Sequence, residues 1–593
     1  MMGQLNPVSL DYLRSLKPDP HPNGRAILEE GLALGRTIQA GKGGFIRSQS
    51  KYKNHAEMKR DLTKQGKIYW NILLGLATLE EQIEAEKKLY EFSQRTGMQI
   101  HSIQSIPSGL VALPPEYREN APATTSYEMY TDEDYEAQQA ACPIDVSFND
   151  YHLSTPNGLT NTILAIKHGS PTIGEFCQFN WGFYGYDNHV ERMCNMVRAL
   201  GVVASKKDEY FEVKTYLDDG YAGYFLDCAS FIGYAMLEHY ICTTLCGARY
   251  VIGFGGLLSE NDTRCAVAMA LDKVLSTEDQ PVLRYLNGST NLQWDHDIHG
   301  NYGVSVPEML FEILVEKKYH MGLGINPVSI TEKIKVPTLQ ELEDIFAAGK
   351  RAEEKAEEWL PYFNFAPLEQ MRDRMAEAGE KLFHNCLEGF QAAGIDIQDP
   401  VEMLLVLTAM NPIRFEQMFH PSTYGTSNTD IQPFYTTVLG RQTMQMKQDI
   451  LHDLDKKQMR GSLSGKTIVV GSGDAHTYGL VLVEGVLQEM GAHTVNAGVD
   501  MDAVDMLDLA DEVGTRFIGI SCHNGQALDY GRQILELAQA RGKEYWIFMG
   551  GKLNAILPGH SEPTEIGDRL IELGIHAEND IAYTVEQLAK LQA

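Results

Sequence analysis

The chain has 593 residues, of which 44% are hydrophobic and 22% are charged. These are globular values, and the length is too great for one ordinary domain, so we expect at least two domains. The formal net charge of −30 argues against nucleic acid and anionic membrane surfaces as partners, because both would repel so acidic a chain.

Cysteine usage and the apolar runs predict a cytoplasmic protein. The nine cysteines are scattered without paired spacing, which fits a reducing compartment better than a disulfide framework. No run of about 18 apolar residues predicts a membrane span, and the N-terminal segment lacks a signal-peptide pattern. We therefore expect no membrane partner. A small-molecule substrate and a homo-oligomeric state are separate expectations.

Most of the chain alternates between short apolar segments and helical stretches. Residues 1–40 are expected to form an N-terminal extension, and residues 41–445 a catalytic domain with helical additions. Examples of the alternation are a strand at 247–255, a helix at 262–275, a strand at 281–286 and a helix at 303–315. This pattern predicts a parallel sheet, and a TIM-like (β/α) barrel is the common single-domain solution.

Charge-rich helical sequence separates this region from the C-terminal part. Residues 339–394 are most simply a solvated helix pair, with a partner surface as the alternative. Residues 446–464 contain Lys456, Lys457 and Arg460 and a Gly/Ser-rich end, and are expected to be a linker. Residues 465–593 then form a second α/β domain.

The most informative turn in the chain runs from residue 471 to 479 and reads Gly-Ser-Gly-Asp-Ala-His-Thr-Tyr-Gly. It follows an apolar segment and precedes an amphipathic one, so it connects a predicted strand to a predicted helix. His476 could present one ring nitrogen to a metal there, while Asp474 holds the other N–H. From this turn alone, a helix-capping aspartate beside a chance histidine explains the sequence equally well.

Two more predicted strands end in small residues. The apolar segment 517–520 ends in Ser-Cys-His-Asn-Gly, and the segment 545–549 ends in Gly550 and Gly551. Glycines at strand ends let a bulky ligand approach the backbone closely.

Together, residues 465–593 resemble the cobalamin-binding domain that holds its cofactor base-off, with a protein histidine on cobalt. The family pattern is D-x-H-x-x-G, then S-x-L or S-x-T, then G-G, in a flavodoxin-like (Rossmann-type) sheet; His523 stands where the family has Leu or Thr. The resemblance implies that His476 binds cobalt and that Asp474 orients it. The implied cofactor-binding residues are Asp474, Ala475, His476, Thr477, Tyr478, Gly479, Ser521, His523, Gly525, Gly550 and Gly551.

A barrel joined to such a domain favours one class of corrinoid protein. Methyl carriers usually place a small helical cap directly before the cobalamin domain, and this chain has limited helical sequence there. Radical mutases instead use the cobalamin domain to seal the carboxyl-terminal mouth of a barrel. The organisation therefore favours an adenosylcobalamin-dependent radical mutase.

The barrel region distantly resembles the catalytic subunit of glutamate mutase, mainly over residues 220–350, and the single-chain organisation resembles 2-methyleneglutarate mutase. The resemblance implies an isomerase that catalyses a carbon-skeleton 1,2-rearrangement of a small carboxylic acid. An amino-acid mutase of the glutamate mutase type, or a corrinoid-dependent methyltransferase or corrinoid-binding protein, remains the alternative. An aminomutase would also need pyridoxal phosphate.

The glutamate mutase resemblance also implies candidate catalytic residues. Glu332 would hold the adenosyl ribose, although Val328 replaces the family's lysine four residues earlier, and Arg47 would grip a substrate carboxylate. No acidic residue matches the family's partner for the substrate amine, so the substrate is expected to differ from glutamate. Trp181 or Tyr186 stands near the place of that partner. The candidate catalytic residues are Glu332, Arg47, Lys167, His168 and Tyr186. An ordinary role in the core or at the surface is the alternative for each.

Overall fold

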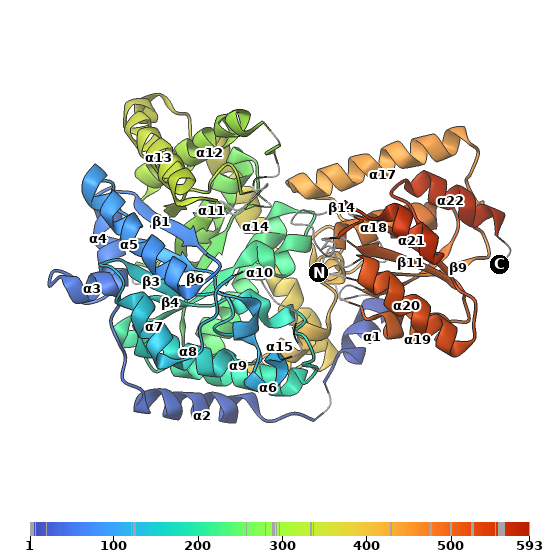
Figure 1. Ribbon diagram of the computed structural model, residues 1–593, viewed down its shortest axis with the longest axis horizontal. Coiled ribbons are helices and arrows are strands. Elements are labelled where there is room, and N and C mark those ends of the chain that lie inside the picture. The colour runs from blue at the N-terminus through green and yellow to red at the C-terminus, as the bar shows by residue number, and fades with distance from the viewer. Residues whose placement is uncertain are drawn as a thin grey trace. The chain divides into compact units, whose positions relative to one another are not determined.

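The protein folds into two compact units, residues 1–438 and residues 439–593 (Figure 1). A computed structural model provides the coordinates. It describes the whole chain except residues 1–4, 6, 19, 120, 122–125, 257, 279, 288–290, 292, 296, 333–334, 336, 427–429, 474–476, 499–500, 523–526, 552, 556–563 and 592–593.

The first unit contains a closed barrel of eight parallel strands. The strands are β1 (Tyr69–Leu74), β2 (Ser102–Ser105), β3 (Asp145–Phe148), β4 (Thr172–Ile173), β5 (Glu212–Tyr216), β6 (Arg249–Phe254), β7 (Leu283–Asn287) and β8 (Gly324–Asn326). Each strand pairs with the next, and β8 closes the barrel by pairing Ile325 with Trp70 of β1. The eight carboxyl ends therefore meet at one end of the barrel, which we call the mouth.

Helices between the strands cover the outside of the barrel (Figure 1). The main ones are α5 (Leu79–Thr96), α7 (Asp132–Gln139), α8 (Gly158–Lys167), α9 (His189–Ala204), α10 (Cys228–His239), α11 (Asn261–Leu275), α12 (Ile298–Tyr319) and α13 (Leu339–Trp359). One continuous apolar core lies between strands and helices, including Val213, Phe254 and Ile313, all fully buried. Burial of this surface is the main force that holds the unit together.

Further helices pack onto this barrel. Within the predicted N-terminal extension, α1 (Pro7–Ser15) contacts α14, and α2 (Gly24–Thr37) lies along α9. The long α14 (Ala366–Ala393) packs on α10 and α11, α15 (Pro400–Ala409) packs on α9, and α16 (Pro412–Phe419) packs on α14. These helices thus extend the core of the barrel unit.

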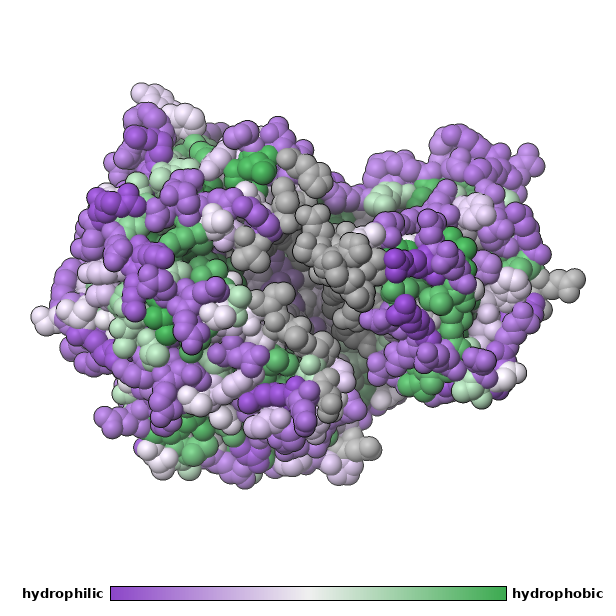
Figure 2. Space-filling view, viewed as in Figure 1, coloured by the Kyte–Doolittle hydropathy of each residue, from purple (hydrophilic) through white to green (hydrophobic). Residues whose placement is uncertain are grey.

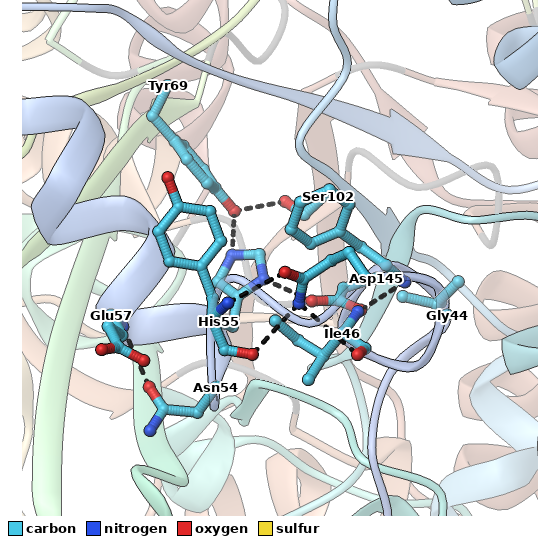
Figure 3. A network of polar contacts seen from close by, with 12 residues as sticks. Gly44, Ile46, Asn54, His55, Glu57, Tyr69, Ser102 and Asp145 are labelled. Carbon is cyan, nitrogen blue, oxygen red and sulfur yellow. Dashed lines mark hydrogen bonds and ion pairs between the residues drawn. The ribbon is translucent and has the colours of Figure 1, made fainter.

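A buried polar network lies at the amino end of the strands, opposite the mouth (Figure 3). His55 of α4 (His55–Lys64) pairs its Nδ1 with Asp145 Oδ2 at 2.7 Å and its Nε2 with the Tyr69 hydroxyl at 2.6 Å. Tyr69 in turn donates to Ser102 at 2.6 Å. Because these side chains start β1, β2 and β3, the network ties three strands to one helix.

The second unit is a five-stranded parallel sheet in the order β10-β9-β11-β12-β15. Its strands are β9 (Thr467–Ser472), β10 (His493–Gly498), β11 (Phe517–Cys522), β12 (Trp546–Gly551) and β15 (His576–Ala577), and β13 (Asn554–Ala555) pairs with β14 (Thr564–Glu565). Its helices are α17 (Val438–Lys456), α18 (Thr477–Glu489), α19 (Ala503–Glu512), α20 (Ala527–Arg541), α21 (Gly567–Leu573) and α22 (Ile581–Lys590). α17 covers part of the segment expected to be a linker.

Both faces of this sheet are apolar, as in doubly wound folds. Val469 and Ile518 belong to the core under α19 and α20, whereas Ile468, Val470 and Phe517 belong to the core under α18 and α22. The structure therefore confirms the predicted fold class, a TIM-like barrel followed by a flavodoxin-like domain. Among the described residues, no helix is long and apolar enough to cross a membrane.

Buried Glu86 gives the barrel unit a testable dependence on pH. Its carboxylate accepts hydrogen bonds from Gln82 at 3.0 Å and Gln138 at 2.8 Å, and burial raises its pKa to about 8. The folded protein therefore keeps a proton that the unfolded chain releases above its ordinary pKa, so stability falls as pH rises from about 4.5 to 8.

We expect Glu86→Gln to remove this contribution, which reaches about 1.4 kcal/mol per pH unit. Urea unfolding between pH 5 and 8 should show the variant gaining stability relative to the parent protein as pH rises. Glu91→Gln, on the exposed side of the same helix, should leave the difference constant. A constant difference for Glu86→Gln as well would contradict the assigned protonation.

Candidate functional site

The motif residues of the second unit follow three neighbouring strands. Ser521 of β11 lies in register with Ser472 of β9 on one side and with Gly550 of β12 on the other. The turns after these strands therefore leave the sheet at the same edge. The strand order also reverses between β10-β9 and β11-β12, which is where such sheets bind ligands.

The described groups at this edge are small and tightly packed. The Ser521 carbonyl accepts hydrogen bonds from Gly473 N at 3.0 Å and from the Ser472 hydroxyl at 3.1 Å. A Cβ on Gly550 would lie 2.9 Å from the carbonyl oxygen of Glu578, and Gly551 has a φ of 108°. The fold itself thus requires both glycines, which also keep side chains away from this edge.

Several predicted cofactor residues lie outside the described part of the chain. These are Asp474, Ala475, His476, His523 and Gly525. Thr477, Tyr478 and Gly479 begin helix α18, and only the backbone of the first two is described. The strands that flank the turn after β9 nevertheless fit a large ligand, because their ends carry serine and glycine rather than bulky residues.

A group of charged side chains lies at the mouth of the barrel. This mouth cluster consists of Asp150 after β3, Glu175 after β4, Lys214 of β5 and Asp219 after β5. Lys214 is fully buried and forms an ion pair with Glu175, which is 1% exposed. The other two members are less buried than this pair: Asp150 is half-buried and Asp219 is exposed.

Burial raises the pKa values of the three acids in this cluster, and repulsion by neighbouring acids adds to the shifts of Glu175 and Asp219. Burial raises the pKa of Glu175 to about 7, and the charge of Asp150 adds to the effect, while Lys214 opposes it. The pKa of Asp150 is raised by burial. Desolvation by the surrounding protein raises the pKa of Asp219, although the residue is exposed at its outer side. The negative charges of Asp218, Asp150 and Glu175 raise this pKa further. Groups shifted in this way at the end of a barrel mark a candidate site.

Aromatic residues adjoin the acids. Trp181 donates from Nε1 to the Asp219 carbonyl at 2.8 Å, and its ring centroid lies 6.3 Å from that of Tyr151. Tyr151 has a φ of 67°, a left-handed conformation that strains a bulky residue. Buried Arg192 holds the Trp181 segment by donating to its carbonyl at 2.6 Å.

Three of the residues predicted to be catalytic lie together, but at the opposite end of the barrel. Arg47 pairs with Glu136 at 2.8 Å, and Lys167 pairs with Asp132 at 2.9 Å. His168 contacts both acids, at 3.0 and 3.1 Å. Lys167 and His168 lie at the end of α8, shortly before β4, so this ion-pair cluster lies at the amino ends of the strands. A catalytic role for these three residues stays a prediction. Their position argues against it, because barrel enzymes have their active sites at the carboxyl ends of the strands.

The other two predicted catalytic residues follow strand ends on the mouth side. Tyr186 comes after β4, and its ring packs on Tyr117 with centroids 5.4 Å apart. Burial and nearby Glu191 raise its pKa to about 12. Glu332 comes after β8 in a half-buried turn, where its N–H donates to the Ser329 carbonyl at 3.0 Å.

Sequence reasoning missed all four members of the mouth cluster. Asp150 and Glu175 each follow a short apolar strand, and Lys214 is a lone charge within another. Charged residues at the ends of predicted barrel strands would have been the signal for finding them. The sequence showed no acidic residue in place of the family's partner for a substrate amine. The structure places the acidic residue Asp219 next to Trp181.

Comparison with known proteins identifies the C-terminal unit. Residues 466–577 match the family model of the B12 binding domain. No curated protein matches the chain. Among solved structures, a crystal structure described as a novel cobalamin-binding protein from Desulfitobacterium hafniense DCB-2 aligns with 16% identity and a TM-score of 0.18, covering 42% of this chain and 80% of that one. The family match indicates a cobalamin cofactor and a cobalamin-dependent function.

The buried ion pair at the mouth can be tested by stability measurements. Lys214→Met should leave Glu175 buried without its counter-charge and destabilise the barrel unit by about 3–5 kcal/mol. Adding Glu175→Gln to that variant should restore most of the loss, because no isolated carboxylate then remains. Urea unfolding of the single and double variants at pH 8 would measure this, and equal losses in both would contradict the pairing.

Proposed function

We propose that this protein is an adenosylcobalamin-dependent isomerase that rearranges the carbon skeleton of a small carboxylic acid. The observation that supports the proposal is the combination, in one chain, of a closed (β/α) barrel and a B12 binding domain matched at residues 466–577. Barrel enzymes bind their substrates at the carboxyl ends of the strands, where the mouth cluster lies.

In this proposal the C-terminal unit holds the cofactor. His476 would hold the cobalt ion through one ring nitrogen, and Asp474 would accept the other imidazole N–H and so fix the tautomer. Ser521, Gly550 and Gly551 would leave room for the nucleotide tail, because their side chains are small or absent. When bound, adenosylcobalamin supplies a carbon-centred radical by cleavage of its cobalt–carbon bond.

The barrel has the tasks of binding, orienting and shielding the substrate. Polar groups of the mouth cluster hold the substrate, with Glu175 and Lys214 fixed by their mutual pairing. Glu332, in the turn after β8, would bind the adenosyl group of the cofactor. Exclusion of water around the reacting atoms prevents side reactions of a radical.

The helix content of the second unit supports a mutase rather than a methyltransferase. Residues 439–466, all described, contribute only α17 ahead of β9. Helices α14, α15 and α16 instead pack on helices of the barrel unit. A methyl carrier would be expected to place a helical cap directly before its cobalamin domain.

The choice of cofactor form provides the test. Full-length protein would be mixed anaerobically with adenosylcobalamin or methylcobalamin and a panel of dicarboxylates and amino acids, and followed by electron paramagnetic resonance. We expect a radical signal only with the adenosyl form, and only with one substrate or a few related ones. Transfer of the methyl group from methylcobalamin, with the adenosyl form inert, would instead show a methyltransferase.

Histidine variants make this test specific for the proposed site. His476→Gly should bind cobalamin more weakly and lose the radical signal, because cobalt loses its protein ligand. His452→Ala, at an exposed position of α17, should behave like the parent protein. An unchanged absorption spectrum and full signal in His476→Gly would rule out the assigned ligand.

A further inference from the structure

A cavity of about 310 Å³, which we call the α4 cavity, lies at the amino end of the barrel, opposite the mouth. Its lining comes from α4, from the start of β5 and from the loops that lead into β7 and β8. None of the residues of the mouth cluster is among its described lining residues. Cavities of this size hold small organic molecules, so the α4 cavity offers a binding site separate from the mouth.

The lining of the α4 cavity changes from buried to exposed. Lys59 and Glu212, each 3% exposed, belong to its buried end together with Met321. Lys64 and Glu278 are exposed and belong to its open end. A small molecule can therefore enter from solvent and reach charged groups that are largely shielded from water, where electrostatic attraction is stronger.

Charged side chains of both signs line the cavity, and each sign comes from different elements. The cations all belong to α4 and are Lys59, Arg60 and Lys64. The acids come from the start of β5, from the last turn of α11 and from the loop after α11, and are Glu212, Asp272 and Glu278. A molecule bound between these elements therefore meets cations on the side of α4 and acids on the side of the barrel.

Buried Glu316 of α12 shows that the two kinds of charge lie close together. Its carboxylate accepts hydrogen bonds from the N–H groups of residues 322 and 323 at 3.1 and 2.9 Å. Burial raises its pKa to about 7, and among the nearby charges Lys59 lowers this pKa and Asp272 raises it. Lys59 and Asp272 thus act on the same group, so one small molecule in the cavity can reach both.

Asp272 itself has a use for a cation. Burial raises its pKa, and a hydrogen bond with Ser276 opposes this shift. An ammonium group beside the carboxylate would replace part of the stabilisation by water that burial removes.

Two residues with a left-handed backbone also line the cavity. Tyr210 has a φ of 64° and His320 a φ of 53°, and each caps the C-terminal end of a helical segment, where glycine is the usual residue. Bulky side chains at such positions strain the backbone, and strain of this kind collects at binding sites. The guanidinium groups of Arg60 and Arg249 stack on the Tyr210 ring, 4.6 and 4.0 Å from its centroid. Tyr210 therefore helps to hold Arg60 in place beside the cavity.

From these observations we infer that the α4 cavity binds a small zwitterion, such as an amino acid whose carboxylate and ammonium groups lie at opposite ends. The carboxylate faces the cations of α4, and the ammonium group faces Asp272. A dianion or a dication of the same length would place one end against groups of its own charge. The inference goes beyond the proposed isomerase function and does not depend on it, because the cavity lies at the opposite end of the barrel.

Three probes that share a five-carbon chain and differ in charge test the inference. Isothermal titration calorimetry on the full-length protein without cobalamin, at pH 7, would compare 5-aminopentanoate, glutarate and 1,5-diaminopentane. We expect 5-aminopentanoate, the zwitterion, to bind at least about tenfold more tightly than the dianion or the dication. Equal or tighter binding of either of these two, or no binding of 5-aminopentanoate, would overturn the inference.

Variants of the lining residues show where the probe binds. Asp272→Asn should weaken binding of 5-aminopentanoate by about tenfold or more, because the ammonium group loses a charged acceptor. Lys64→Gln, at an exposed position that the fold does not depend on, should weaken it by about threefold.

Each variant has a matched control outside the cavity lining. Asp262→Asn changes an exposed acid at the other end of α11, and Lys67→Gln changes an exposed lysine after α4. Both controls should bind the probe as the parent protein does. Equal losses in Asp272→Asn and Asp262→Asn would overturn the placement of the ligand. A loss in Asp219→Asn, at the mouth, with none in Asp272→Asn would place the probe at the mouth and also overturn it.

Discussion

The ammonium group of Lys214 is fully buried in strand β5, and the mouth of the barrel depends on how its charge is compensated. A buried cation needs a carboxylate with good geometry, and Glu175 at the end of β4 provides it. The same positive charge opposes the raised pKa values of Asp150, Glu175 and Asp219. One cation on β5 thereby pairs with Glu175 and favours the charged form of all three acids.

In both units the candidate binding residues lie at the carboxyl ends of parallel strands, where barrels and doubly wound sheets bind their ligands. In the barrel these ends carry charged side chains. In the second unit they carry Ser472, Ser521 and Gly550, which hardly protrude from the sheet edge. The barrel end is therefore equipped to bind a small polar molecule, and the sheet edge to accommodate a large flat cofactor.

Sequence predicted the elements far better than it predicted the barrel site. The strand at 517–520 and the helix at 262–275 could be predicted because their burial is recorded in local apolar patterns. Arg47 matched a family pattern locally, and His168 stood nearest to another family position, but such a match does not say at which end of a barrel a residue lies.

The mouth cluster could not be predicted in this way because its members are distant in sequence. Asp150, Glu175 and Asp219 follow three different strands and meet only when the barrel closes. Glu175 and Gln104 also reveal their unsatisfied acceptors only in three dimensions. The D-x-H turn differs, because its residues are consecutive and the family match at 466–577 covers them.

Movement of hydrogen between cofactor and substrate tests the central claim most directly. Full-length protein would be incubated with adenosylcobalamin tritiated at the 5′ carbon and with the substrate that gives the radical signal. An isomerase should move tritium into the substrate and its product, because the adenosyl carbon exchanges hydrogen with the substrate during turnover. Product formed while all tritium stays in the cofactor would contradict a radical isomerase.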